Sequence, residues 1–386
     1  MGKIMPTELM RESVLTISIL YTFMSLLTIV HANWMYLGIA NHAPKIPEDQ
    51  PAELMQLAGD APEDPNDAIA NSARAVCSAL PGLVAQQIEV CQHYPDTLKA
   101  VSEGARRGIR ECQYQFRHER WNCTTREDDY SVFGYTLQRG SRETAFIYAV
   151  TSAGVVHAIT QACSSGALNE CSCDLSKQGR TTPEGWKWGG CSDNLKFGVQ
   201  FSRKFVDAPE KSKQWESKNV RSLMNLHNNE AGRQAVSHLM RMQCRCHGVS
   251  GSCELKTCWK NVPTFSQVGD YLKKKYQKSV QVPVKQQKRL RRKSGRKFPV
   301  GKQELVHIRK SPDYCESDTE KGILGTTGRL CNKTSDGPDR CSILCCGRGF
   351  NTKVVKKVER CQCKFIWCCY VKCKPCITRT DIHTCK

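Results

Sequence analysis

Ser250 is the residue whose neighbours best suit it for chemistry at an exposed hydroxyl. It stands between two glycines in the segment CHGVSGSC at 246–253. His247 could in principle activate it as a nucleophile. The nucleophile elbow of serine hydrolases requires G-x-S-x-G between a strand and a helix, however, and Ser252 occupies the position of the final glycine. The segment therefore favours an accessible serine over a catalytic one, and a secreted hydrolase that uses Ser250 is the alternative.

The 24 cysteines of the chain could bind zinc or form disulfides. Cys373 and Cys376 form a lone C-x-x-C, and no second pair stands at the distance that a zinc finger or ribbon requires. Most other close pairs are adjacent or one residue apart, which is too close for most tetrahedral zinc sites. An even, dense set of cysteines is typical of disulfides in an oxidising compartment. We therefore expect disulfides and no metal site.

Cysteine spacing predicts two hairpins, because residues paired across an antiparallel hairpin have a nearly constant sum of residue numbers. The C-terminal pairs that satisfy this rule are Cys361–Cys376, Cys363–Cys373 and Cys368–Cys369, although six cysteines permit other pairings. This hairpin would have the apolar tip FIWCCYV at 365–371, which is either an exposed partner surface or part of the core. A looser hairpin around Ser250 is bounded by the pairs Cys244–Cys258 and Cys246–Cys253.

The charge of the chain favours an anionic partner. Its 57 Lys and Arg residues exceed its 37 Asp and Glu residues and give a formal net charge of +20. Nucleic acid, an acidic glycan or an anionic membrane face would fit this charge. The basic run KRLRRK at 288–293 would be a nuclear signal or nucleic-acid patch in a nuclear protein, whereas in a secreted protein it would meet sulfated glycans.

The length of 386 residues, 40% of them hydrophobic, excludes a small peptide toxin and wholesale disorder.

The N-terminus predicts export. Residues 14–30 form an apolar stretch, and VHA at 30–32 fits cleavage of a signal peptide after Ala32, with a retained signal anchor as the alternative. Asn122 and Asn332 each begin an N-x-T tripeptide that fits N-glycosylation. Asn332 is the better candidate, because oxidation of Cys123 within the first tripeptide would hold Asn122 in a folded backbone.

We predict a disulfide-rich α+β fold: a helical N-terminal domain with a disulfide-stapled hairpin, and a small cysteine-rich β-hairpin C-terminal domain. The C-terminal part has too few aliphatic residues for an ordinary core, so disulfides must hold its strands together. Helical spacing of apolar residues is clearest at 143–162 and at 220–240. In the second of these helices, the residues expected to face the core are Leu223, Met224, Leu226, Ala231, Ala235, Leu239 and Met240. The predicted divisions are a signal peptide at 1–32, an N-terminal segment at 33–76 with an acidic, proline-rich flexible stretch at 41–70, a helical domain at 77–272 that includes the hairpin 244–258, a basic linker at 273–301, and a cysteine-rich domain at 302–386 with the tip 365–371.

Several segments resemble the Wnt family. CHGVSGSC at 246–253, followed by KTCW at 256–259, is similar to a highly specific signature of that family. Further similarity lies in ECQ at 111–113, FR at 116–117, RWNC at 120–123, WKWGGCSDN at 186–194, and the cysteine pattern from Cys315 to Cys385. The likeness covers nearly all of 77–386 and the short segment 33–40. The stretch between residues 40 and 77 has no counterpart in the family.

The resemblance implies a secreted signalling glycoprotein rather than an enzyme, with no cofactor beyond a covalent palmitoleoyl group on Ser250 and N-glycans. A membrane-bound acyltransferase would attach the lipid, and a secretion carrier would transport the product. The Ser250 hairpin, or thumb, would insert the lipid into the cysteine-rich domain of a Frizzled receptor, and the C-terminal tip, or index finger, would contact the same domain. Further partners would be a lipoprotein-receptor-related co-receptor and heparan sulfate, with no nucleic acid. The residues implied in receptor binding are His247, Gly248, Val249, Ser250, Gly251, Phe365, Ile366, Trp367, Cys368, Cys369, Tyr370 and Val371.

The same resemblance implies a full set of disulfides. In the helical half it implies Cys77–Cys91, Cys112–Cys123, Cys163–Cys171, Cys173–Cys191, Cys244–Cys258 and Cys246–Cys253. In the C-terminal half it implies Cys315–Cys346, Cys331–Cys341, Cys345–Cys385, Cys361–Cys376, Cys363–Cys373 and Cys368–Cys369. Two rival classes remain besides the hydrolase: a nuclear metal-binding or nucleic-acid-binding protein, and a matrix protein without a receptor.

Overall fold

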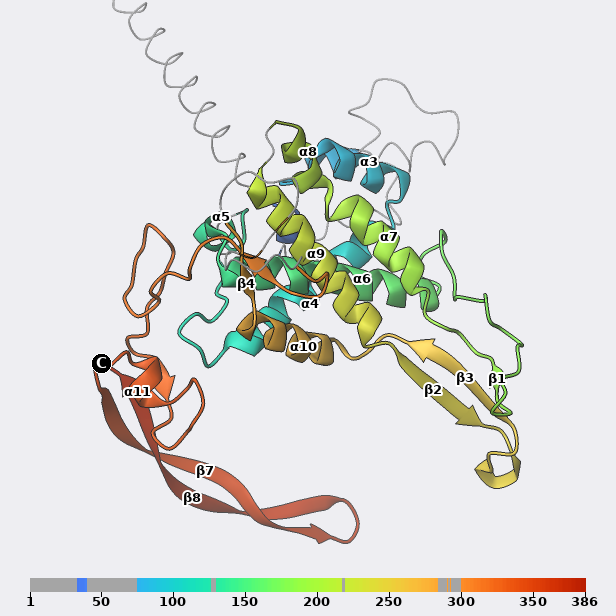
Figure 1. Ribbon diagram of the computed structural model, residues 1–386. Coiled ribbons are helices and arrows are strands. Elements are labelled where there is room, and N and C mark those ends of the chain that lie inside the picture. Colours follow the sequence, from blue (N-terminus) through green and yellow to red (C-terminus); the bar gives the residue numbers. More distant parts are fainter. Residues whose placement is uncertain are drawn as a thin grey trace, which may run out of the picture. The chain divides into compact units, whose positions relative to one another are not determined.

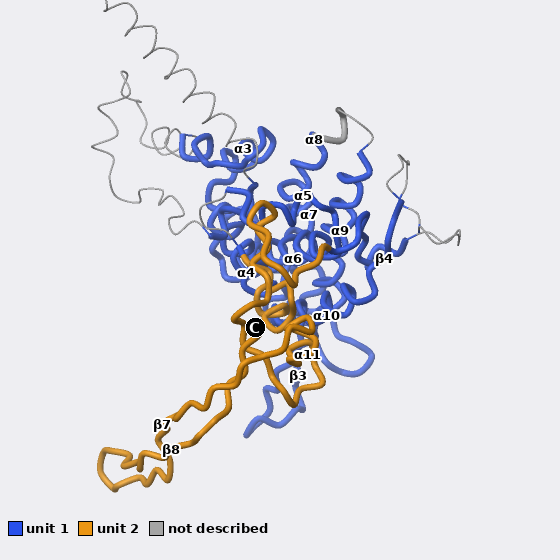
Figure 2. The backbone as a smooth tube through the Cα atoms, turned by 90° about the vertical axis from the view of Figure 1, so that its left-hand side faces the viewer, with its two compact units in different colours: residues 1–112, 125–311 blue, residues 113–124, 312–386 orange. Residues whose placement is uncertain are grey.

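The computed structural model describes residues 33–39, 75–125, 130–216, 219–283, 290, 292 and 300–386. The predicted signal peptide, the acidic stretch 41–70 and most of the basic run 288–293 lie outside the described residues. The chain forms two compact units (Figures 1 and 2). Unit 1 contains the residues up to Cys112 and Thr125–Ser311, and unit 2 contains Gln113–Thr124 and Pro312–Lys386. The C-terminal part of unit 2 thus begins at Pro312, later than the boundary predicted at 302, and unit 2 also includes Gln113–Thr124, a segment predicted to belong to the helical domain.

Unit 1 is mainly helical and is built around the buried helix α6 (Arg142–Ser164), which confirms the helix predicted at 143–162. α6 packs against α7, α9 and α10 (Figure 1). Among the described helices, α6 alone is long and apolar enough to cross a membrane, but 89% of its apolar window is buried inside the protein. Its apolar character is therefore that of a core helix. Further helical elements of this unit with described bounds are η1 (Trp34–Gly38), α3 (Ala85–His93), α4 (Thr97–Phe116, whose last turn belongs to unit 2), α5 (Tyr135–Arg139), α7 (Leu195–Phe205), α8 (Ala208–Glu216), α9 (Val220–His238), η3 (Val249–Gly251) and α10 (Phe265–Gln277).

Glycines allow these helices to approach each other closely. A Cβ atom at Gly154 of α6 would lie 2.2 Å from the carbonyl oxygen of Gly104 in α4. A Cβ atom at Gly232 of α9 would lie 2.0 Å from the carbonyl oxygen of Ala149 in α6. Glycine lowers helix propensity, so close packing is the reason that Gly232 stands inside a helix.

The buried face of α9 is more polar than predicted. The helix predicted at 220–240 is confirmed, but Asn228, Asn229 and Arg233 are buried as deeply as its apolar residues. Arg233 donates two hydrogen bonds of 3.0 Å to the two carboxylate oxygens of Asp207, and the Asn228 side chain pairs with the backbone of Val306. Buried polar groups require such partners. Of the predicted core residues, Met224, Ala231 and Ala235 are buried, whereas Leu223, Leu226, Leu239 and Met240 are only partly buried.

The predicted start of a linker at 273 is wrong, because α10 continues to Gln277. After it, β4 (Val280–Gln281) pairs in parallel with β5 (Val306–His307), and the side chain of Val282 is buried in the same apolar cluster. Leu290, from the basic run, packs against this cluster. Residues 273–282 are therefore part of unit 1. Their many lysines hide the apolar spacing, because the lysine side chains alternate with buried Tyr276 and Val280.

Unit 2 is a small sheet held by disulfides in place of a large apolar core. Its strands are ordered β6-β8-β7, and its buried cluster consists of Leu344 and three half-cystines, Cys341, Cys345 and Cys385. Long β7 and β8 form a hairpin that extends beyond this base (Figure 1). The elements are β6 (Leu330–Cys331), α11 (Cys341–Leu344), β7 (Phe350–Ile366) and β8 (Tyr370–Cys385). The fold class is thus disulfide-rich α+β, as predicted.

Candidate functional site

The thumb is an antiparallel hairpin that extends away from the helices of unit 1 (Figure 1). Its strands are β2 (Arg241–Cys246) and β3 (Lys256–Asn261). Cys244 lies directly opposite Cys258 in the register, and the two are disulfide-bonded with their Cα atoms 4.0 Å apart. A second disulfide joins Cys246 to Cys253 and closes the loop that contains Ser250. The sequence placed these four cysteines in one hairpin, and the structure brings them together in those pairs.

Ser250 lies at the apex of the thumb on a backbone that hydrogen bonds to itself. The amide of Gly248 donates to the carbonyl of Ser252 at 2.8 Å, and the amide of Ser252 donates to the carbonyl of Val249 at 3.1 Å. Ser250 adopts a left-handed conformation, with φ of 56° and ψ of 25°. Its side chain is exposed, and within the described part of the chain its hydroxyl has no hydrogen-bond partner. The loop therefore presents a free hydroxyl on an ordered backbone.

The two glycines that flank Ser250, Gly248 and Gly251, are required for different structural reasons. A Cβ atom at Gly248 would lie 2.5 Å from the carbonyl oxygen of Ser252, so no side chain fits there without moving the loop. Gly251 has a φ of +79° and open space around it, so it is required for its backbone conformation. A motif of two glycines around a serine is thus what this tight loop needs.

His247 does not contact Ser250 in a way that would activate it. Its Nε2 atom lies 2.6 Å from the hydroxyl oxygen of Thr257 on β3, and its amide donates to the carbonyl of Leu255. These contacts hold the ring of His247 against the opposite strand of the hairpin, β3. The geometry therefore suits Ser250 as the acceptor of a modification better than as a hydrolytic nucleophile.

The segment 186–194 anchors the thumb along its strand β3, a role that sequence reasoning missed. Its strand β1 (Lys187–Trp188) pairs in parallel with β3. Gly190 has no side chain, so its backbone packs closely on the ring of Trp259. The carboxylate of Asp193 accepts a hydrogen bond from the backbone amide of Val262 at 2.7 Å. The backbone amide of Asp193 donates a hydrogen bond to the carbonyl of Lys260. The available signal was the Gly-Gly step between Trp188 and a cysteine, which indicates close backbone packing.

One acidic side chain near this anchor has a shifted pKa. Hydrogen bonds from the side chain and amide of Ser176 hold the pKa of Asp174 below its ordinary value. The amide of Asp174 in turn donates to the carbonyl of Ser192 within the anchoring segment. Asp174 therefore stays ionised as a structural acceptor in this loop.

The index finger is the hairpin of β7 and β8 in unit 2. Its register shifts by one residue between Cys361 and Lys364, where Gln362 has a φ of 48°. Disulfides join Cys361 to Cys376 and Cys363 to Cys373 on either side of this irregularity. The last paired residues are Ile366 and Tyr370. A β-bulge of this kind increases the local twist of a strand, so the hairpin is bent just below its apex.

The apex of the finger exposes apolar side chains to solvent. Trp367 is 90% exposed, Phe365 is 69% exposed, and Tyr370 and Val371 are each more than half exposed. Ile366 is exposed to a lesser degree, at 37%. The alternative that this tip forms part of the core is therefore excluded. A cluster of exposed aromatic and aliphatic side chains at one apex is typical of a binding surface.

The predicted bond between Cys368 and Cys369 is wrong for this structure. Both cysteines are free and exposed, and their sulfur atoms lie 2.8 Å apart, which is longer than the disulfide length of about 2.05 Å. Spacing arithmetic places the two cysteines at the turn but does not fix the distance between their sulfur atoms. The hydrogen bond to Cys368 raises the pKa of the Cys369 thiol.

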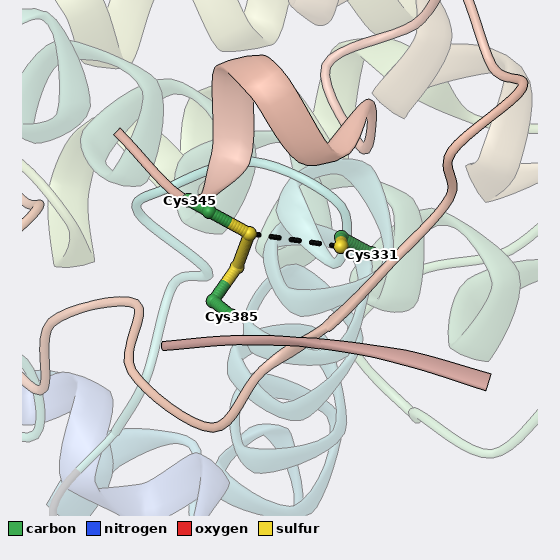
Figure 3. A group of neighbouring side chains, drawn as sticks. All are labelled: Cys331, Cys345 and Cys385. Atoms are coloured by element: carbon green, nitrogen blue, oxygen red, sulfur yellow. Dashed lines mark hydrogen bonds between the residues drawn. A yellow bond between two sulfur atoms is a disulfide. The ribbon is translucent and has the colours of Figure 1, made fainter. Parts of the chain in front are cut away.

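Disulfides hold the base of the finger together. Cys345 is bonded to Cys385, and its sulfur lies 3.6 Å from that of Cys331 (Figure 3). Cys331 is itself bonded to Cys341. Three sulfurs gather here, but each belongs to a disulfide and none is a thiolate that could bind a metal. The structure also contains Cys77–Cys91, Cys163–Cys171, Cys173–Cys191 and Cys315–Cys346, and it bonds Cys112 and Cys123 as well.

The two glycosylation tripeptides differ in exposure. Asn332 is exposed, and its side-chain oxygen accepts hydrogen bonds of 3.0 Å from the amide and hydroxyl of Thr334. Asn122 is partly buried, and the hydroxyl of Thr124 donates to it. Its neighbour Cys123 is disulfide-bonded and has a positive φ. Asn332 is thus the more accessible acceptor of a glycan.

Comparisons with known proteins agree on one family. The model of the wnt family matches residues 79–386. Protein Wnt-16 of Bos taurus is 50% identical over 361 residues, covering 92% of each chain. Protein Wnt-2b of Homo sapiens is 51% identical over 324 residues, covering 81% of this chain and 80% of that protein. A chain in the solved structure of human WLS in complex with WNT8A matches with a TM-score of 0.55 and 39% identity, over 75% of this chain and 94% of that chain.

Proposed function

The chain belongs to the Wnt family of signalling ligands, and on this premise we propose that it is a secreted, acylated ligand of Frizzled receptors. A palmitoleoyl group on Ser250 is the main anchor in the cysteine-rich domain of the receptor. The apex of the index finger is a second contact with the same domain. The exposed hydroxyl of Ser250 on a backbone that hydrogen bonds to itself is the observation that carries this proposal.

The lipid supplies the affinity that the small thumb apex lacks. Its loop residues between Gly248 and Ser252 include one large apolar side chain, Val249, which is 87% exposed. Burying an acyl chain contributes about 0.8 kcal/mol per methylene, so ten or more methylenes offer up to about 8 to 10 kcal/mol. The disulfides and backbone hydrogen bonds of the loop reduce the entropy lost on docking. The thumb thus acts as a rigid carrier of the lipid.

The finger adds an apolar contact that needs no modification. Trp367 at its apex can reach into a pocket of the partner, and buried tryptophans dominate many protein interfaces. The disulfide between Cys363 and Cys373 lies directly below the apex and limits its motion. Output of the pathway, whether through β-catenin or not, depends on the co-receptor and the responding cell.

Other partners follow from the same proposal. A membrane-bound acyltransferase modifies Ser250 in the endoplasmic reticulum, and a carrier then moves the acylated protein to the cell surface, because a free acyl chain would partition into membranes. The structural likeness to a chain from human WLS in complex with WNT8A supports a carrier of that kind. A lipoprotein-receptor-related co-receptor binds the helical unit, heparan sulfate binds basic surface, and Asn332 and Asn122 carry N-glycans.

Mass spectrometry of the secreted protein tests the modification. Trypsin without reduction releases the peptide 246–256, which contains Cys246, Ser250 and Cys253. We expect an added palmitoleoyl mass together with the loss of two hydrogens for the internal disulfide. A bare Ser250 in a protein that still binds the receptor domain would overturn the proposal. Reaction of Ser250 with a serine-directed hydrolase probe would instead support the secreted hydrolase.

A further inference from the structure

The outer half of the index finger carries positive charge directly behind its apolar apex. The segment 360–380 contains five basic residues and no acidic residue. Lys364 and Lys372 lie directly opposite each other in the register, immediately below the apex residues Phe365 and Val371. All four side chains are exposed. The hairpin therefore has an uncharged tip followed by a cationic layer.

This cationic layer has no internal counter-charge. Like charges directly opposite each other destabilise a pair of strands. No ion pair within the described residues involves Lys364 or Lys372. The nearest acidic residues along the two strands, Glu359 and Asp381, lie outside the segment 360–380, and Glu359 is paired with Lys357. An external anion would relieve the repulsion between the two lysines.

The spacing of the two layers matches the depth of a bilayer interface. Lys364 lies two residues, or about 7 Å of strand, before Ile366 at the end of β7, and Trp367 follows in the turn. Amphipathic helices at a membrane surface bury their apolar side chains about 5 to 10 Å into the boundary between headgroups and acyl chains, and the apex could reach the same depth. Tryptophan and tyrosine are enriched at that depth, and the apex supplies Trp367 and Tyr370. A linear acidic glycan would pair with the lysines but would leave these apolar side chains in water.

We infer that the apex 365–371, together with Lys364 and Lys372, is an interfacial anchor for a bilayer with anionic headgroups. The anchor does not depend on acylation of Ser250 or on the receptor. A single acyl chain gives only marginal membrane binding, and stable anchoring takes two signals. The finger supplies the second signal on the same molecule. Since the apex is also the proposed receptor contact, the receptor domain and the bilayer compete for it.

Vesicle binding by the full-length Ser250→Ala protein tests this anchor without the lipid. The vesicles contain phosphatidylcholine with or without phosphatidylserine, and bound protein is measured by co-sedimentation. We expect binding to the anionic vesicles and little binding to the neutral ones. Trp367→Ser should weaken it about tenfold, because an apolar side chain leaves the interface. The reversal of both lysines, K364E with K372E, should weaken it at least about tenfold, because each cation near an anionic surface contributes about a fivefold gain.

Matched controls come from exposed residues elsewhere. Leu330→Ser and Lys302→Glu change side chains of the same kinds outside the apex, and both should leave vesicle binding unchanged. Trp367→Phe keeps an aromatic side chain, so it should retain vesicle binding. Brominated lipids quench tryptophan fluorescence, and the part of this quenching that comes from Trp367 should be lost in the variant.

Two outcomes would overturn the anchor. One is an absence of binding to anionic vesicles by a correctly disulfide-bonded Ser250→Ala protein, including the case in which heparin alone binds. The other is binding that Trp367→Ser and the lysine reversal do not weaken. Receptor-domain binding by the acylated protein in lipid-free buffer is measured separately, so failure of the membrane anchor and failure of the proposed receptor contact give different results.

Discussion

The thumb and the index finger have the same construction but expose different chemistry. Each is an antiparallel hairpin with two disulfides near its apex. One disulfide in each hairpin, Cys244–Cys258 in the thumb and Cys363–Cys373 in the finger, joins residues whose Cα atoms are 4.0 Å apart. The thumb ends in small residues whose backbone groups bond to each other around Ser250. The finger ends in large apolar side chains that point into solvent. The finger thus presents apolar surface by its own side chains, whereas the thumb presents a hydroxyl to which we propose that a lipid is added.

The difference has a consequence for when each tip can bind. The apex of the finger is apolar as soon as it folds, whereas under the proposed mechanism the thumb gains its apolar group only when Ser250 is acylated. We expect that acylation would leave the fold unchanged, because Ser250 is exposed and its hydroxyl bonds to no described residue. Under this proposal, contact through the thumb requires a prior modification and contact through the finger does not.

The largest effect is expected from Ser250→Ala, which would remove the difference between the two tips by leaving only the finger. Affinity for the receptor domain should fall at least about a thousandfold. This factor corresponds to a loss of about 4 kcal/mol, which is less than the full contribution expected from burying the acyl chain. The measurement is the dissociation constant for the purified receptor domain. Ser252→Ala, two residues away, is the control and should bind as the unaltered protein does. Equal losses in the two variants would contradict a special role of Ser250.

Trp367→Ala tests the finger's side of the comparison. We expect a loss of about 2 kcal/mol, or roughly thirtyfold in affinity, as is usual for a tryptophan at the centre of an interface. The melting temperature should not change, because the side chain is 90% exposed in the free protein. Leu330→Ala, which alters another exposed apolar residue of unit 2, should leave affinity unchanged. A loss of stability in place of affinity would mean that the tip is structural.

Gly248→Ala tests whether acylation needs the shape of the thumb loop. The new methyl group would clash with the carbonyl of Ser252, and overpacking of this kind costs about 1 to 3 kcal/mol. The acylated fraction measured by mass spectrometry should fall severalfold. Gly301→Ala, where the nearest atom to a new Cβ would be 3.5 Å away, is the control. An unchanged acylated fraction would show that the modifying enzyme does not read the loop's conformation.

The last effect is expected from acid, which should act on the stability of the helical unit that carries the thumb. Burial lowers the pKa of His307 to about 4, with a further contribution from Arg142, and Glu143 opposes the shift. Ser279 also contacts the ring of His307. Because the folded pKa lies below the unfolded value of about 6.5, this histidine stabilises the fold above that pH, and the contribution is lost as pH falls toward 4.

Thermal unfolding between pH 7 and pH 4.5 measures this effect. Stability should decrease by up to about 1.4 kcal/mol per pH unit from this group, and His307→Gln should flatten the dependence. His238→Gln, which alters a histidine that is exposed, should not. A pH dependence that is the same in all three proteins would assign acid sensitivity to other groups.

Local patterns predicted much of the two hairpins. The sums of residue numbers placed Cys244 opposite Cys258, because strand pairing in a hairpin is set by its turn. The same arithmetic placed the finger apex near residue 368. It could not detect the bulge near Gln362 or the geometry that keeps Cys368 and Cys369 apart, since both depend on backbone angles that spacing does not encode.

Features that depend on distant partners could not be predicted. Arg233 is buried because Asp207 lies beside it in the fold, and nothing in the local pattern of α9 indicates this. The pairing of Val280 with Val306 joins strands of only two residues across a basic segment, so no periodicity reveals it. The anchoring of the thumb by Asp193 likewise depends on contacts with residues near 260.

The most direct test of the account compares one sequence in two chemical states. The unaltered chain is made in cells with and without the membrane acyltransferase, purified from the cells in detergent in both cases, and its binding to a Frizzled cysteine-rich domain is measured. We predict binding at least about a thousandfold tighter for the acylated form, with the same disulfides and melting temperature in both. Equal binding by the two forms would contradict the claim that the thumb binds through a lipid on Ser250.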